Sequence, residues 1–163
     1  MTVPQKGPSL GGLGEVATKL QFRRSGIATK LCSESVEEFR ANGGQALFLG
    51  TGNPEAAKVY RRLGWTKLAG ANVMVNITNG SPEEFLVNHF YTNTKPVVTD
   101  GSPAFHLPMI PLILTPNNWQ VLDANLDIFS TRYKTQNSCM GLYPRYRALS
   151  TENRGAWFGA ITN

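Results

Sequence analysis

The sequence predicts an α/β fold, in which helices flank a mixed sheet. One observation is a strand–helix–strand pattern over residues 13–50, where a stretch of helical periodicity separates two short runs that fit strands. A unit of this kind packs as two roughly parallel strands with the helix over one face of the sheet. The other observation is the composition, because 163 residues with 41% hydrophobic and 17% charged side chains are enough for a folded core.

The unit begins with a strand and a helix. Residues 1–12 are expected to form a loose lead-in, and residues 13–18 a short strand near a ligand. From residue 26 to residue 41 apolar side chains recur at helical spacing, and the glycines at 43 and 44 end the helix. The predicted apolar face consists of Ile27, Ala28, Leu31, Cys32, Ser35, Val36 and Phe39. Residues 46–50 form a compact apolar run, which is typical of a buried strand.

A second helix is expected directly after this strand. Asn53 has the residue type of an N-cap, and Pro54 suits the first helical position. Gly64 stands where a left-handed glycine ends such a helix. That kind of ending folds the next residue back onto the last turn, so Trp65 is expected to pack near Tyr60.

The chain then continues through a strand and a short helix. Residues 67–78 are expected to form one strand, because valine and isoleucine alternate with other residues. A capping box at residues 81–84 opens a helix that runs to residue 90. Residues 92–107 are rich in Thr, Pro, Gly and Asp without periodicity, and we interpret them as a linker.

The last third of the chain gives weaker patterns. Residues 109–114 are expected to form a strand, and a helix is expected to start at residues 115–116. Its apolar face consists of Trp119, Leu122, Leu126 and Phe129. Residues 133–155 have no clear pattern, and residues 156–161 are expected to form a strand.

The net charge of +5 is placed unevenly along the chain. Residues 1–70 hold ten basic and five acidic side chains, whereas the remainder is balanced. This excess indicates an anionic ligand, although a solvated basic face has the same composition. Nucleic acid is not expected, because no basic run is interleaved with aromatic residues.

Other classes of protein are disfavoured by composition. No apolar run approaches the roughly 20 residues that span a bilayer, so no membrane association is expected. The first twelve residues lack the apolar region of a signal peptide. Cys32 and Cys139 form neither a disulfide framework nor a metal motif, so no metal site is predicted. A cytoplasmic location is the expectation.

The stretch from Phe22 to Thr29 is the strongest candidate for a binding site. It reads as the end of a strand, a basic turn with Arg23 and Arg24, and the start of a helix at Gly26. The free N–H groups of a helix start and the partial positive charge of the macrodipole attract phosphate. This turn therefore predicts a phosphate site.

Three stretches together resemble the GNAT superfamily of acetyl-CoA-dependent N-acetyltransferases. They are residues 14–18 (GEVAT), 22–28 (FRRSGIA) and 53–65 (NPEAAKVYRRLGW). Their order and separation are similar to those of the two central coenzyme-binding motifs of that family. The resemblance covers about residues 13–78 and implies a GNAT-like fold. It also implies direct transfer of an acetyl group from acetyl-CoA to a primary amine of a small molecule or peptide.

The resemblance implies roles for the matched positions. Tyr60 would protonate the departing thiolate, and Glu15 would be the general base. Asn53 would bind near the pantetheine arm or shape its loop. The pantetheine arm would pair with the backbone of Val16, Ala17 and Thr18. The pyrophosphate site would consist of Arg23, Arg24, Ser25, Gly26, Ile27, Ala28 and Thr29. The residues alone leave alternatives open, in which Tyr60 is a core side chain and Glu15 faces solvent.

The front half that a GNAT domain has before this point is not recognisable. We therefore predict residues 1–91 as the back half of a GNAT-like domain, 92–107 as a linker, and 108–163 as the front half of a second or permuted domain. The chain could be a slice through a tandem acetyltransferase or a permuted complete domain. A non-catalytic coenzyme A-binding or incomplete module is the alternative function. A homo-oligomer or a partner chain could complete its sheet.

Overall fold

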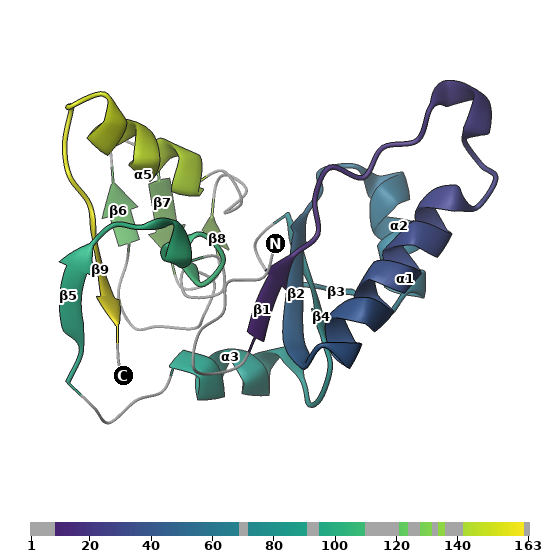
Figure 1. The fold of residues 1–163 in the computed structure, drawn as a ribbon, viewed down its shortest axis with the longest axis horizontal. Coiled ribbons are helices and arrows are strands. Elements are labelled where there is room, and N and C mark those ends of the chain that lie inside the picture. Colours follow the sequence, from purple (N-terminus) through teal and green to yellow (C-terminus); the bar gives the residue numbers. More distant parts are fainter. Residues whose placement is uncertain are drawn as a thin grey trace. The chain divides into compact units, whose positions relative to one another are not determined.

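The computed structural model describes residues 9–68, 72–90, 95–109, 121–123, 128–131, 134–135 and 142–161. They form two compact units, which are described separately (Figure 1). The described part of the first unit consists of residues 9–68 and 72–82. The second unit contains the described residues from 83 onward, so the boundary between the units falls at the start of α3 (Pro82–Phe90).

The first unit contains the predicted mixed sheet, with strand order β1-β2-β4-β3. β1 runs parallel to β2, while β4 runs antiparallel to both β2 and β3. The strands are β1 (Ser9–Gly12), β2 (Gly44–Gly50), β3 (Thr66–Lys67) and β4 (Val73–Ile77). The helices are α1 (Ile27–Ala41) and α2 (Pro54–Arg62). The prediction of an α/β fold with a mixed sheet is therefore confirmed.

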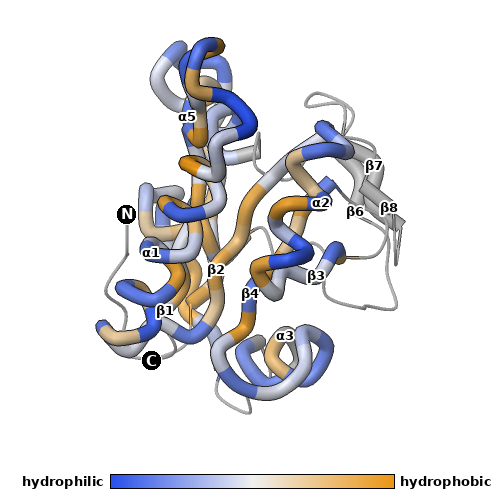
Figure 2. Tube along the Cα trace, turned by 90° about the vertical axis from the view of Figure 1, so that its right-hand side faces the viewer, coloured by the Kyte–Doolittle hydropathy of each residue, from blue (hydrophilic) through white to orange (hydrophobic). Residues whose placement is uncertain are grey.

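One hydrophobic cluster joins α1 and α2 to the sheet. Hydrophobic residues along β2 and β4 are visible in Figure 2. The cluster consists of Cys32, Val36, Leu47, Leu49, Tyr60, Trp65 and Met74. Because both helices contribute to it, they pack on the same face of the sheet, and burial of this face is the main favourable term for the unit.

The predicted helix ends are confirmed. Gly43 and Gly64 are left-handed, with φ of 79° and 83°. After α2 the N–H of Trp65 donates to the carbonyl oxygen of Tyr60 at 3.1 Å, which is the long bond of a Schellman ending. The rings of Tyr60 and Trp65 lie 5.9 Å apart between centroids, as the glycine position predicted.

The apolar face of α1 is buried only in part. Cys32 and Val36 are buried, and Phe39 packs over the backbones of Gly11 and Gly44. In contrast, the side chains of Ile27 and Leu31 are 40% and 54% exposed. Apolar spacing therefore identified the helix but overestimated the width of its contact with the sheet.

The prediction of a strand over residues 13–18 is wrong. The first strand is β1 (Ser9–Gly12), and the last bond to its neighbour runs from the N–H of Leu13 to the carbonyl oxygen of Phe48, at 2.9 Å. Glu15 then takes a left-handed conformation with φ of 55°, which an extended strand cannot contain. Phe22 also lies in a short 3₁₀ turn, η1 (Leu20–Phe22), rather than in a strand.

The single strand expected over residues 67–78 is also wrong, because two strands occupy this stretch. β3 and β4 are antiparallel partners, and the N–H of Leu68 donates to the carbonyl oxygen of Val73 at 2.9 Å. A turn follows β4, with Gly80 at φ of 82°, and the predicted helix is present as α3.

The second unit contains two small sheets. Its described elements are β5 (Val97–Asp100), η2 (Pro103–Phe105), β6 (Val121–Asp123), β7 (Ile128–Thr131), β8 (Lys134–Thr135), α5 (Leu142–Thr151) and β9 (Phe158–Ile161). β9 confirms the strand predicted at the end of the chain, and it pairs antiparallel with β5. β5 itself falls within residues 92–107, where no strand was expected.

The helix expected from residue 115 is wrong where the structure describes it. Leu122 and Phe129, which were assigned to one helical face, are direct partners in the antiparallel pair of β6 and β7. Spacing by seven residues suits either arrangement, and strand pairing decides between them. Residues 110–120 and 124–127, with Trp119 and Leu126, lie outside the described residues. No described helix is long and apolar enough to cross a membrane.

A buried amide connects three elements of the first unit. Asn76 in β4 is 2% exposed, and its side-chain nitrogen donates to the carbonyl oxygen of Leu63 at 3.2 Å. Its side-chain oxygen accepts from Arg40 at 2.8 Å. The end of α1, the end of α2 and the sheet are thus held by one side chain.

We predict that Asn76→Ala lowers the free energy of unfolding of this unit by about 1–3 kcal/mol, because it removes the partner of a buried carbonyl. Urea unfolding, followed through the buried amide signals of β2 and β4 by NMR, measures the change. Asn79→Ala, at an exposed position, is the control and should stay within about 0.5 kcal/mol of the natural chain. Equal unfolding midpoints for the two variants would contradict the role of Asn76.

Candidate functional site

The candidate site begins where β1 leaves the sheet. Beyond Leu13 the chain rises away from β2 and returns at the start of α1 (Figure 1). β2 continues to Gly50, so its last residues have no partner from β1 in the described chain. The β1 side of β2 is therefore not paired with β1 beyond Phe48.

Polar contacts within the loop fix its return path. The Nε of Arg23 donates to the carbonyl oxygen of Thr18 at 3.2 Å. The hydroxyl of Ser25 donates to the carbonyl oxygen of Phe22 at 2.5 Å. Arg24 and Gly26 are left-handed, with φ of 63° and 82°. These turns bring the basic segment directly to the first turn of α1.

The N-terminus of α1 lacks a side-chain cap. Gly26 is its N-cap residue, no side chain accepts a hydrogen bond from the first turn, and that turn contains no acidic residue. Its N–H groups and the positive end of the macrodipole therefore have no internal counter-charge. A bound anion would satisfy them.

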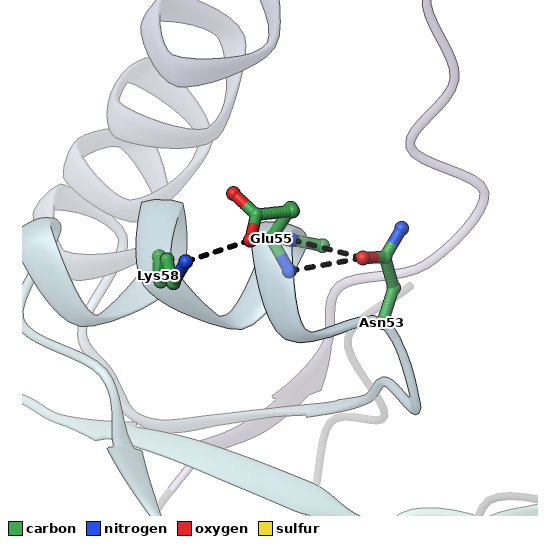
Figure 3. Close-up of polar contacts among 4 residues, drawn as sticks. Asn53, Glu55 and Lys58 are labelled. Carbon is green, nitrogen blue, oxygen red and sulfur yellow. Dashed lines mark hydrogen bonds and ion pairs between the residues drawn. The ribbon is translucent and has the colours of Figure 1, made fainter.

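The N-terminus of α2 is the opposite case. The side-chain oxygen of Asn53 accepts from the N–H groups of Glu55 and Ala56, at 3.0 and 3.5 Å. Glu55 also places a carboxylate in the first turn and bonds to Lys58 at 2.7 Å (Figure 3). Asn53 is thus confirmed as an N-cap, and of the two helices only α1 begins without a side-chain cap.

Charges connect the starts of the two helices. The pKa of the exposed Glu55 carboxyl is lowered, first by its hydrogen bond to Lys58 and the charge of Lys58, and then by Arg24 and Arg62. Arg24 therefore lies within electrostatic range of the start of α2. The fold brings the two predicted coenzyme motifs to the same end of the unit.

Tyr60 lies inside the core and faces α1. It is 9% exposed, and its pKa is raised, first by burial and then by the nearby Cys32. Burial also raises the pKa of the Cys32 thiol, which favours a core role for that residue. Tyr60 is a core side chain, as one interpretation predicted, and it keeps its phenolic proton at neutral pH, as the acid role requires.

The loop residues predicted to bind the pantetheine arm and to act as base are mostly exposed. Glu15, Val16 and Ala17 are exposed, and Thr18 is half-buried. In the described residues this stretch forms no strand, so the backbone at Val16 and Ala17 is outside the sheet ladder. The carbonyl of Thr18 already accepts the bond from Arg23.

Two apolar residues of this loop are exposed. Leu20 and Phe22 in η1 are 78% and 49% exposed. Phe22 begins the predicted binding stretch, whereas Leu20 lies outside it and only its apolar type within a polar loop could have drawn attention. In the described residues no three His, Cys, Asp or Glu side chains come together as a metal site.

We predict opposite effects on stability for two alanine substitutions. Gly26→Ala lowers the free energy of unfolding by about 1–2 kcal/mol, because a left-handed φ of 82° is strained for alanine although the space is open. Gly52→Ala meets equally open space without a left-handed φ, and it leaves stability unchanged or raises it by up to about 1 kcal/mol. Denaturant unfolding measures both variants, and a shift of equal sign would contradict the predicted strain.

Comparison with known proteins agrees with this geometry. Residues 1–68 match the family model described as "Acetyltransferase (GNAT) domain". This range includes β1, the basic turn, α1, β2 and α2. No curated protein and no solved structure matches the chain. Residues 1–68 are therefore similar to the acetyltransferase domains of the GNAT superfamily.

Proposed function

We propose that this chain carries an N-acetyltransferase site, which transfers the acetyl group of acetyl-CoA to a primary amine by direct attack. The observation that carries the proposal is the uncapped start of α1 beside Arg24, inside the segment that matches the GNAT family. GNAT domains generally use acetyl-CoA and act on amines. The identity of the amine, a partner chain and a cytoplasmic location stay predictions.

The residues around the start of α1 suit a pyrophosphate. Backbone N–H groups from Arg24 to Thr29 are offered at a helix end without an acidic side chain. Arg23 is anchored to Thr18 and so holds its positive charge beside the turn. Gly26 brings no side chain into the approach, since a Cβ there would meet no atom within 4 Å.

The backbone beside the end of β2 suits the pantetheine arm. Within the described residues, neither the backbone at Val16 and Ala17 nor the β1 side of β2 beyond Phe48 takes part in a strand pairing. An extended chain with amide groups can form hydrogen bonds to backbone groups of this kind. Asn53, at the start of α2, shapes the end of this region.

The chemistry needs a nucleophile, a base and an acid. The amine nitrogen attacks the thioester carbonyl carbon, a C–N bond forms, and the C–S bond breaks. In this proposal Tyr60 gives its proton to the departing sulfur, and Glu15 takes the proton of the amine. Orientation of the two substrates supplies a large part of the rate.

A second function has its own supporting observation. β1 has one partner, β2, in the described residues, so its other edge is open. An open edge is a place where a further strand can add. The chain could then bind coenzyme A without catalysis, or act only after another chain completes the sheet.

We predict that Arg24→Glu weakens coenzyme A binding at least about tenfold, because a negative charge replaces a positive one at the pyrophosphate. Isothermal titration calorimetry with coenzyme A measures this. Arg154→Glu is the matched control, since Arg154 is paired with Glu152 in the second unit. Unchanged affinity for the Arg24 variant would refute the pyrophosphate site.

We predict that Tyr60→Phe lowers turnover about 100-fold or more with little change in KM, because the ring still packs on Trp65 while the acid is lost. Thiol release from acetyl-CoA with a mixture of amines is the assay, and Tyr143→Phe is the control. Equal turnover would exclude the acid role. If the natural chain binds coenzyme A but releases no thiol with any amine, the non-catalytic function is favoured instead.

A further inference from the structure

A second basic site lies on another side of α2. A pocket of about 200 Å³ is lined by the loop that follows β2, by α2, and by residues of β3, of β4 and just before β4. Tyr60 is not among its lining residues. The residues that matter for its chemistry are Asn53, Lys58, Arg61, Lys67, Asn72 and Met74.

The charge of this pocket is positive and only partly compensated. Lys58, Arg61 and Lys67 line it, and its described lining contains no carboxylate. Lys58 is engaged with Glu55 at 2.7 Å (Figure 3). Within the described residues, neither Arg61 nor Lys67 takes part in an ion pair. Two cations therefore face the same cavity without a counter-charge.

The polar side chains that line the pocket can also donate hydrogen bonds. Asn53 uses its side-chain oxygen on the backbone of α2, so its amide nitrogen, which points away from the helix in Figure 3, remains a donor. Thr51 accepts from the N–H of Asn53 at 3.2 Å and keeps its hydroxyl proton to donate. Met74, which is 1% exposed, gives the pocket an apolar wall.

We propose that this pocket binds a phosphate or carboxylate group of a compact anion, at a site separate from the start of α1. The forked guanidinium of Arg61 can hold two oxygens of such a group, and Lys67 adds a point charge. The volume is below the roughly 300–1,000 Å³ of sites for drug-sized ligands, so a small ligand fits. The basic excess of residues 1–70 then serves two anion sites, one at Arg24 and one at Arg61.

The test uses the whole chain and simple anions as probes. Inorganic phosphate and acetate are titrated separately into the isotopically labelled protein, with sodium chloride at equal ionic strength as the reference. We expect saturable NMR shifts at the backbone amides of Asn53, Arg61, Lys67 and Asn72 with at least one of the two probes. Shifts that grow linearly, as with chloride, for both probes would overturn the proposal.

Substitutions test whether the anion binds at the basic side chains of this pocket. Arg61→Gln weakens the apparent affinity of the active probe at least about tenfold, and Lys67→Gln weakens it in the same direction. Both side chains are exposed, so the fold is expected to persist. Arg154→Gln, the matched control in the second unit, leaves the affinity unchanged. An unchanged affinity in Arg61→Gln would overturn the assignment.

Competition separates this site from the coenzyme site. Coenzyme A added to the phosphate-bound protein is expected to shift the amides of the α1 start and to leave the pocket amides of Arg61, Lys67 and Asn72 at their phosphate-bound positions. If coenzyme A displaces the probe from the pocket, the pocket is part of the coenzyme site and the proposal is wrong. The phosphate and acetate titrations use neither coenzyme A nor acetyl transfer, so their outcome is independent of the proposed function.

Discussion

The candidate site depends on the point where hydrogen bonding between β1 and β2 stops. The bond from Leu13 to Phe48, at 2.9 Å, is the last of that ladder. β2 continues, and among the described strands its final residues, Leu49 and Gly50, pair with β4 alone. Because Glu15 is left-handed, the chain beyond Leu13 cannot follow β2 any further. The loop that leads to α1 therefore begins where this ladder is interrupted.

The two helices differ at their starts: a side chain caps α2, whereas the start of α1 has no such cap and is the proposed binding site. α2 begins with a complete cap from Asn53 and a carboxylate in its first turn, and it ends on Gly64 and the amide of Asn76. α1 also ends at a left-handed glycine, Gly43, but no side chain caps its start. Because glycine is the N-cap residue, the start of α1 gives up only about a few tenths of a kcal/mol relative to a capping side chain. The packing of Cys32 and Val36 in the core compensates for this, which leaves the α1 start free for an anion.

Sequence reasoning succeeded where the interaction is local. Asn53 and Gly64 were predicted correctly because a cap depends on neighbours a few residues away. β1 was missed because its four residues, Ser-Leu-Gly-Gly, have no strand pattern of their own and are extended only through their pairing with β2. The candidate site follows the same division. The basic turn could be identified from the chain, whereas the approach of Arg24 to Glu55 and the pocket at Arg61 exist only in the folded unit.

The position of Tyr60 bears on both of its interpretations, as a core side chain and as the acid that protonates the thiolate. An ordinary tyrosine, with a pKa near 10, is a weaker acid than an ordinary thiol near 8.5, so proton transfer to a free thiolate would be uphill by about 2 kcal/mol. The environment of Tyr60 changes the pKa of the tyrosine and also the pKa of a thiol beside it. Burial raises the pKa of Tyr60, and it also raises the pKa of the Cys32 thiol beside it. A coenzyme thiol bound next to them would be raised for the same reason, since desolvation penalises every thiolate. The higher pKa of Tyr60 opposes proton transfer and the higher pKa of the thiol favours it, so the core packing of Tyr60 is compatible with its proposed role as an acid.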